Sequence, residues 1–296
     1  MGKMTMSKLD AEIRAGRGQG HGDDYRPWLY LRRRNPSPVS CQVSAHMPLS
    51  RRAHQYLSRS EYLIALAVHW LMPRDVREQY PVWPQPHEHP LEGAPGGHVG
   101  LPRADGLLAI AADLGIAHGR YVGTDIPYVA TLDLMVTVTP TTAAAVEVKP
   151  EYLHIGTDAP RRVLERLAIT AEYCRRLRIS HTVAEGRDLP PALAGNLECI
   201  MDGADVESYI GRDDWMRYRD ELCCRIDSGI SLGDATRAAA ETCSLPWLQA
   251  VRAMHGCLWH RAPDADLSIR LHMSRPLAPG GAALRDSIAK RLLGAA

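Results

Sequence analysis

Two short segments with alternating side chains constrain the fold of this chain more than any other feature. Residues 131–138 and 143–149 both alternate with a period of two, and the sequence Thr-Pro-Thr-Thr separates them at 139–142. Alternation of this kind is typical of β-strands, and a short proline-containing segment between two strands is typical of a turn. The sequence therefore predicts an antiparallel β-hairpin.

The apolar side chains also predict the register of this hairpin. With the turn centred on Pro140, the apolar side pairs Leu132 with Val148, Leu134 with Val146, and Val136 with Ala144. The same register places Asp133 opposite Glu147 on the other side, with Lys149 two residues further on. A slip by one residue would move both acids into the apolar layer, so the hydrophobic pattern itself brings them together.

Two opposed carboxylates predict a cation site. Directly opposed side chains lie ~5 Å apart at Cβ, and two carboxylates at that separation repel unless they are protonated or bridged by a cation. Mg²⁺ prefers hard oxygen ligands, and Lys149 beside it could orient an attacking water or stabilise a pentavalent phosphate. Asp133, a gap of thirteen residues, Glu147, one residue and Lys149 follow one another here. This order is the pattern of metal-dependent nucleases with the restriction-endonuclease fold.

A cross-strand Glu–Lys pair on the surface is the alternative interpretation of this pattern. The nuclease interpretation is favoured because Lys149 is one of four lysines among 35 Lys and Arg residues, and because it ends an otherwise apolar strand. A third acid, Glu61, is a candidate from a preceding helix. Ser58 and Glu61 also form a capping box, which already gives this carboxylate a role.

The other elements before residue 186 predict an α/β or α+β domain, with a mixed sheet flanked by helices. We expect helices at 58–72, 107–114 and 161–178, a strand at 179–184, and a loop rich in Pro, Gly and His at 81–106.

The last third of the chain is predicted to be mostly helical. Residues 186–196 have the composition of a linker, and they are followed by expected helices at 214–227, 231–242 and 246–260 and an alternating, wing-like segment at 264–274. This order is that of a winged helix-turn-helix domain. A small helical domain without a role in DNA binding is the alternative.

Charge is unevenly distributed although the net charge is +1. Residues 1–60 carry 11 Lys and Arg against 4 Asp and Glu, whereas residues 61–160 carry 5 against 12. The basic, Gly-rich N-terminal arm could contact an anion such as nucleic acid, and the acidic stretch could hold a cation, or the two could neutralise each other across the fold. No apolar run reaches the ~20 residues of a membrane span, and residues 1–14 lack a signal-peptide core, so we expect a cytoplasmic protein.

Other candidate sites have weaker patterns. His87-Glu-His89 resembles a metal clamp, but it lies in the Pro-rich loop and no third ligand is evident. The run Arg32–Arg34 could contact phosphate, although a solvated charge run is an equal alternative. The seven cysteines form no C-x-x-C pair, which predicts reduced, buried thiols rather than a zinc site.

Six short motifs occur in order over about residues 8–185. They are Gly16-Arg-Gly-Gln-Gly-His-Gly22, Tyr25-Arg-Pro-Trp-Leu29, Leu57-Ser-Arg-Ser-Glu61, Val76-Arg-Glu-Gln-Tyr-Pro81, Thr131-Leu-Asp133 and Val148-Lys-Pro150. In combination they resemble the motifs of the TnsA family, the endonuclease subunits of bacterial cut-and-paste transposases. Beyond these residues only the winged-helix-like order of elements is similar.

The resemblance implies two domains and a catalytic set. The domains would be a restriction-endonuclease-like catalytic domain at 1–186 and a C-terminal winged-helix-like domain at 187–296 for contact with a partner or DNA. The catalytic residues would be Glu61, Asp133, Glu147 and Lys149. Mg²⁺, with Mn²⁺ as a substitute, would be held by Asp133, Glu147, the carbonyl of Val148 and Glu61.

The resemblance also implies a substrate and partners. The chain would hydrolyse phosphodiester bonds at the 5′ ends of a transposable element, with transposon-end DNA as substrate and no membrane contact. A DDE-type transposase similar to TnsB would cut and join the 3′ ends, and an AAA+ ATPase similar to TnsC would contact the C-terminal domain. Two alternatives remain: a stand-alone restriction- or repair-type nuclease, and a non-catalytic winged-helix DNA-binding protein whose hairpin acids are structural.

Overall fold

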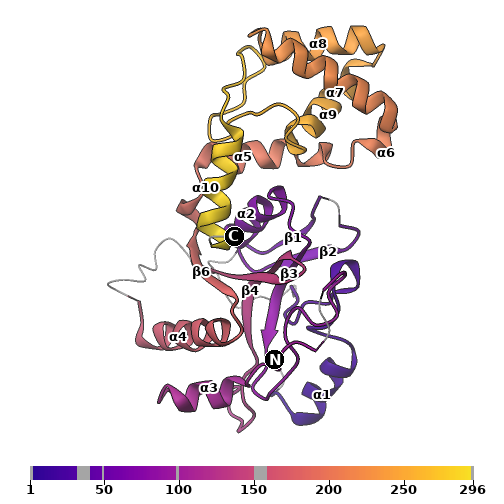
Figure 1. Ribbon diagram of the computed structural model, residues 1–296. Helices are drawn as coiled ribbons and strands as arrows, with labels where there is room; N and C mark the ends of the chain where they lie inside the picture. Colours follow the sequence, from indigo (N-terminus) through magenta and orange to yellow (C-terminus); the bar gives the residue numbers. More distant parts are fainter. Residues whose placement is uncertain (1–2, 32–40, 49, 98–99, 150–158, 295–296) are drawn as a thin grey trace.

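Figure 1 shows a computed structural model of the protein, which describes residues 3–31, 41–48, 50–97, 100–149 and 159–294. Its central sheet has the strand order β3-β4-β5-β6, formed by Asp75–Val82, Ala130–Thr139, Thr142–Lys149 and Ser180–Glu185. The pairs β3–β4 and β4–β5 are antiparallel, whereas β5 and β6 are parallel. A two-stranded sheet of β1 (Val43–His46) and β2 (Ala53–Tyr56) lies next to β3. The mixed sheet expected from the sequence is confirmed.

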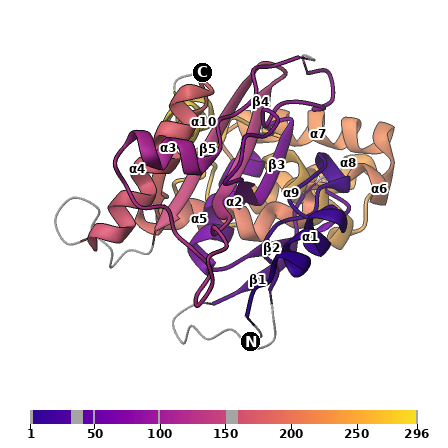
Figure 2. The same cartoon turned by 90° about the horizontal axis from the view of Figure 1, so that it is seen from below.

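Helices cover both faces of the central sheet (Figures 1 and 2). On one face lies α2 (Arg59–Trp70), with α5 (Pro191–Ile200) beside it, and the other face carries α3 (Leu107–Asp113) and α4 (Arg161–Arg176). Alternate residues of β5 face two different hydrophobic cores. Val146 packs in the core with α2, and Ala145 packs in the core with α3 and α4. No helix in the described ranges is long and apolar enough to cross a membrane.

The last third of the chain is largely helical, as expected. It contains α6 (Glu207–Ile210), α7 (Arg212–Asp227), α8 (Leu232–Cys243) and α9 (Trp247–Trp259), which occupy the upper part of Figure 1. The side chain of Ser231 accepts a hydrogen bond from the backbone N–H of Asp234 and caps α8. The final helix, α10 (Gly281–Leu293), returns to the central sheet and packs against β5, β6 and α2.

The linker predicted at 186–196 is wrong. Residues 186–188 form a 3₁₀ turn, and the helix α5 begins at Pro191. Two consecutive prolines indicate a linker by composition, but a proline at the first helical position needs no backbone N–H donor. Leu193 and Leu197 of α5 are fully buried in the core that α2 shares with α7, α8 and α9. The boundary between 1–186 and 187–296 therefore remains a prediction, with a continuous core on both sides of it.

The wing predicted at 264–274 is also wrong. These residues form turns and irregular backbone, and their only ladder contact is an isolated bridge between Ala265 and Pro279. The buried side chain of Asn196 on α5 supplies the missing partners: its amide nitrogen donates to the carbonyls of Leu267 and Ile269, both at 2.8 Å, and its oxygen accepts from Leu271 N–H at 3.1 Å. Backbone groups of this segment thus form hydrogen bonds with a side chain instead of with a neighbouring strand.

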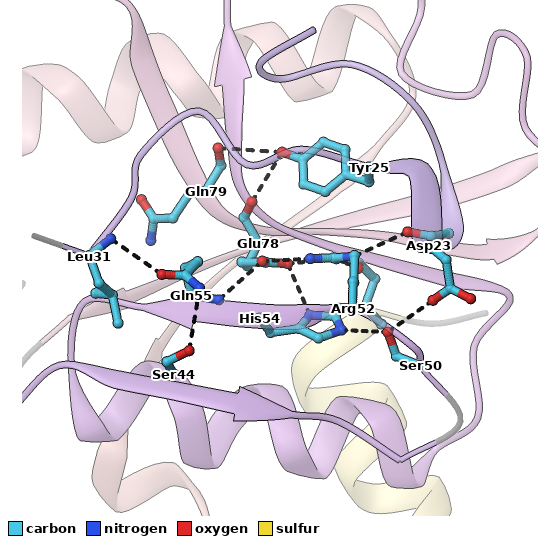
Figure 3. Close-up of polar contacts among 12 residues, drawn as sticks. Asp23, Tyr25, Leu31, Ser44, Ser50, Arg52, His54, Gln55, Glu78 and Gln79 are labelled. Carbon is cyan, nitrogen blue, oxygen red and sulfur yellow. Dashed lines mark hydrogen bonds and ion pairs between the residues drawn. The ribbon is translucent and has the colours of Figure 1, made fainter. Parts of the chain in front are cut away.

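A buried ion-pair network ties the N-terminal residues and β2 to β3 (Figure 3). The fully buried carboxylate of Glu78 accepts hydrogen bonds from two nitrogens of Arg52, both at 2.7 Å, and from Gln55 N–H at 3.1 Å. His54 Nδ1 lies 3.0 Å from the same carboxylate. Burial alone would raise the pKa of Glu78, but the hydrogen bonds from His54 and Arg52 and their positive charge lower it to about 2.

Glu78→Gln should reduce the free energy of unfolding by about 3–5 kcal/mol, because it leaves the Arg52 guanidinium buried without its counter-charge. In the wild type, the low pKa of Glu78 contributes stability that is complete above its ordinary pKa of 4.5 and is lost as the pH falls toward 2. Urea unfolding at a series of pH values measures both effects.

Asp125→Asn is the matched control, because Asp125 and its partner Arg120 are 97% and 63% exposed. This exposed pair should contribute less than about 1 kcal/mol. Equal losses of stability in the two variants would contradict the role given to the Glu78 network.

Candidate active site

The predicted hairpin forms, and its ladder ends next to Asp133. Leu134 pairs with Val146 and Val136 with Ala144, as the sequence predicts. The ladder does not continue to residue 133. Instead, the carboxylate of Asp133 accepts a hydrogen bond from the Val148 N–H at 2.7 Å. The side chain of Asp133 therefore takes the place of a backbone partner at the point where the β4–β5 ladder stops.

The predicted pairing of Leu132 with Val148 is wrong for the same reason. Leu132 packs in the core with α3 and α4, whereas Leu134 and Val148 pack in the core with α2. Strict alternation would have kept all three on one face. The β4 residues before Leu134 do not pair with β5 and remain paired only with β3. Their side chains therefore need not keep the alternation that the β4–β5 pairing would impose.

Glu61 lies in the first turn of α2, where Ser58 forms the cap that the motif predicts, but the Glu61 carboxylate accepts from Leu57 instead of from the Ser58 N–H of a full capping box. The Ser58 hydroxyl accepts from the Glu61 N–H at 3.1 Å, and the Glu61 carboxylate accepts from the Leu57 N–H at 2.9 Å. The same carboxylate oxygen accepts a hydrogen bond at 3.0 Å from the side-chain amide of Gln79 on β3. Glu61 is 8% exposed, so α2 and β3 together hold a buried carboxylate.

The charges of Glu61 and Asp133 act on each other. Burial raises the pKa of Glu61, and the negative charge of Asp133 raises it further, against the hydrogen bonds from Leu57 and Ser58. Burial also raises the pKa of Asp133, as does the charge of Glu147, while Lys149 lowers it. The structure thus brings the predicted acids and the lysine close enough for their charges to interact, and the raised pKa values show that Glu61 and Asp133 are costly to ionise together.

Glu147 is held by contacts that the hairpin alone does not predict. One oxygen of its buried carboxylate accepts a hydrogen bond from the Thr170 hydroxyl of α4 and lies 3.1 Å from His181 Nε2 of β6. The other oxygen is 2.9 Å from Lys149 Nζ. Burial alone would raise the pKa of Glu147, but the hydrogen bond from His181, the charge of Lys149 and the Thr170 hydrogen bond lower it to about 2. Glu147 is therefore an ionised partner of Lys149, and its charge also acts on Asp133.

The donor chemistry of the site fits a hard divalent cation. Within the described ranges, no three His, Cys, Asp or Glu side chains are gathered closely enough to hold a metal ion. The side chains at the site offer the carboxylate oxygens of Glu61 and Asp133, and the predicted ligand set adds the carbonyl of Val148. Mg²⁺ and Mn²⁺ take such ligands, often with only one or two carboxylates from the protein. A cation between these two carboxylates would offset the desolvation and the like charge that raise their pKa values.

The weaker sequence candidates have structural roles or lie outside the described residues. His87 Nε2 lies 3.0 Å from the Tyr173 hydroxyl, and His89 Nε2 lies 3.4 Å from the Leu177 carbonyl, so the two rings contact different groups. Arg32–Arg34 belongs to the residues that are not described. All seven cysteines are free, as expected, but Cys41, Cys199 and Cys224 are exposed rather than buried.

Three residues near the site were not predicted from the sequence. They are Thr170 and His181, which hold Glu147, and Gln79, which holds Glu61. Thr170 and His181 belong to a helix and a strand with no marked polar motif. Gln79 lies inside one of the six motifs, Val76-Arg-Glu-Gln-Tyr-Pro81, which is the one signal that could have identified it.

Asp133→Asn should stabilise the metal-free protein at about pH 8. For a carboxyl group with a raised pKa, the folded state binds more protons than the unfolded state, so stability falls as the pH rises above the ordinary value near 4. Asparagine can still accept the Val148 N–H bond, and it removes the charge that acts on Glu61. Thermal melting in EDTA should show a higher melting temperature for Asp133→Asn than for the wild type.

Mg²⁺ should reverse the order of the melting temperatures of Asp133→Asn and the wild type. The cation should raise the melting temperature of the wild type and have little effect on Asp133→Asn, because binding to the folded state stabilises it. Asp125→Asn, which removes an exposed carboxylate, should behave as the wild type in both conditions. A metal-free Asp133→Asn protein less stable than the wild type at pH 8 would contradict the charge balance inferred for the site.

Comparisons with known proteins give one clear similarity. No protein-family model matches the chain. The chain is 29% identical over 196 residues to the transposon Tn7 transposition protein TnsA of Escherichia coli, a match that covers 65% of this chain and 62% of that protein. The chain thus spans less than two thirds of the relative that it matches. The similarity is to the family that the motifs of the sequence already resemble.

Proposed function

We propose that this chain is a Mg²⁺-dependent DNA endonuclease that hydrolyses phosphodiester bonds at the 5′ ends of a transposable element, as one subunit of a heteromeric transposase. The main support for the proposal is the set of Asp133 and Lys149, both half-buried, with the buried Glu61 near the end of the β4–β5 ladder. The similarity to a transposition protein supports the biological context.

Each residue of the set has a role that follows from its contacts. Glu61, Asp133 and the Val148 carbonyl would hold Mg²⁺, which when bound supplies electrostatic stabilisation of the phosphoryl group and the leaving oxygen. Lys149 would orient the attacking water, because its ammonium is a compact charge with several donors. Glu147 would fix the position of Lys149 through their 2.9 Å contact, and a direct bond from Glu147 to the metal would require the release of its present partners.

The proposed partners follow from the same family resemblance. A DDE-type transposase similar to TnsB would act on the 3′ ends, and an AAA+ ATPase similar to TnsC would contact the C-terminal helices. The helices α7, α8 and α9 follow one another with short turns, in the order of a helix-turn-helix domain, and provide the surface for a partner or DNA. A net charge of +1 predicts weak binding to DNA by the isolated chain.

Strand-mapped cleavage tests the proposal. The purified chain is incubated with end-labelled transposon-end DNA and Mg²⁺, with and without the partner transposase. We expect cuts near the 5′ ends only with the partner. Asp133→Ala and Lys149→Ala should each lower the rate by at least about 100-fold, the usual loss for a group that acts in a proton-transfer step or holds the metal.

Two further variants sharpen this test. Glu147→Gln should cause a smaller loss, of about 10-fold, because it weakens the support of Lys149 without removing it. Asp125→Asn, a change on the exposed surface, should cut as the wild type does. Cutting without the partner would indicate a stand-alone nuclease. Equal cleavage by the wild type and both alanine variants would show that these residues are not catalytic.

A further inference from the structure

Gln79 has a backbone conformation that is unusual for its position. It lies inside β3, is fully buried, and has φ of +49° in the left-handed region. On either side of it the ladder to β4 is intact, with Glu78 paired with Leu134 and Tyr80 with Leu132. Gln79 itself falls opposite Asp133, where no pair forms. A non-glycine residue in this region is uncommon, and such residues gather at functional sites.

At Gln79 the even-numbered side chains of β3 change from one face of the sheet to the other. Before Gln79, Val76 packs in the core with α2, whereas Tyr80 and Val82 pack in the core with α3 and α4. All three have even numbers and would share one face in a regular strand. The reversal at Gln79 lies beside the corresponding reversal at Asp133 in β4, so the two strands change face together.

The side chain of Gln79 connects the two strands to the predicted catalytic acid. Its amide nitrogen donates to Glu61 at 3.0 Å, and its amide oxygen accepts from the Thr131 hydroxyl of β4 at 3.3 Å. Both ends of the amide are therefore used, and the amide nitrogen faces Glu61 because an ionised carboxylate only accepts hydrogen bonds. A buried donor on one carboxylate oxygen sets the orientation of that carboxylate.

Residues 16–28, called here the Gly-rich segment, hold the backbone of Gln79 through its carbonyl. The Gln79 carbonyl accepts from the Trp28 N–H at 3.2 Å and from the Tyr25 hydroxyl at 3.4 Å, and Tyr25 also donates to the Glu78 carbonyl at 3.0 Å (Figure 3). The approach is close: a Cβ atom on Gly18 would lie 2.2 Å from Pro81. The glycine at this position allows the segment to reach the strand.

We propose that Gln79 is a positioning residue, which orients the Glu61 carboxylate for a divalent cation shared with Asp133 and is itself held in place by the Gly-rich segment. The inference rests on the proposed function, because the cation belongs to that site. It adds Gln79 to the site. It also gives the Gly-rich segment a role, because that segment holds the Gln79 carbonyl and through Gln79 sets the orientation of the Glu61 carboxylate. Loss of the Gln79 amide should weaken cation binding without unfolding the chain.

Binding of Mn²⁺ to the full chain tests this inference without a measurement of cleavage. Electron paramagnetic resonance of free Mn²⁺ gives the dissociation constant for the wild type, Gln79→Asn, Tyr25→Phe and Asp133→Ala. Asparagine tolerates the left-handed region, but its side chain is one methylene too short to bridge Glu61 and Thr131. The matched control is Gln55→Asn on β2, where the Gln55 side chain contacts Leu31 N–H and Ser44 instead.

We expect Gln79→Asn to weaken Mn²⁺ binding by about 10- to 100-fold, the usual effect of losing a group that orients a metal ligand. Its melting temperature in EDTA should remain close to that of the wild type. Tyr25→Phe should weaken binding in the same direction by a smaller factor, and Gln55→Asn should leave it unchanged.

Other outcomes overturn the inference in distinguishable ways. If Asp133→Ala loses Mn²⁺ binding but Gln79→Asn binds as the wild type, the inference fails and the proposed function stands. If Asp133→Ala binds Mn²⁺ as well as the wild type, the proposed cation site itself is wrong, and the inference fails with it. Wild-type affinity in Tyr25→Phe beside a weakened Gln79→Asn would overturn the role of the Gly-rich segment.

Discussion

The hydrogen bond from the Val148 N–H to the Asp133 carboxylate determines the arrangement of everything around the candidate site. It ends the β4–β5 ladder at Leu134 and holds a carboxylate where a backbone carbonyl would otherwise lie. Because that half-buried carboxylate acts on the buried Glu61, the two negative charges destabilise the site until a proton or a cation offsets them. The geometry that ends the ladder is thus the geometry that favours cation binding.

Rigid contacts surround this unfavourable charge pair. The Glu78–Arg52 pair anchors β2 to β3, and Gln79, the next residue, orients Glu61. On the opposite side of Asp133, Glu147 holds Lys149 and is held in turn by α4 and β6. Stabilising contacts of this kind allow a protein to retain a site that costs stability when it is metal-free. The Arg52–Glu78 pair joins the basic residues 1–60 to the acidic residues 61–160, which is one of the arrangements expected from the charge distribution.

Sequence reasoning succeeded where a pattern is local and failed where distant residues decide the structure. Period-two alternation predicted the hairpin and its register at Leu134, and the capping box placed Glu61 at a helix start. The same alternation misplaced Leu132, since a side-chain hydrogen bond interrupts the ladder. The wing was predicted from alternation at 264–274, but Asn196, far away in sequence, satisfies that backbone. Nothing local marks Gln79 as a strand residue in the left-handed region.

The position of a bound cation would show whether Glu61 and Asp133 form one metal site. Crystals of the protein soaked in Mn²⁺ give an anomalous difference map, in which the metal is identified without reference to activity. We predict a peak between the carboxylates of Glu61 and Asp133, within bonding distance of the Val148 carbonyl, with Glu147 still in contact with Lys149. A map with Mn²⁺ at another site, or a fully occupied site formed without Asp133, would contradict the account.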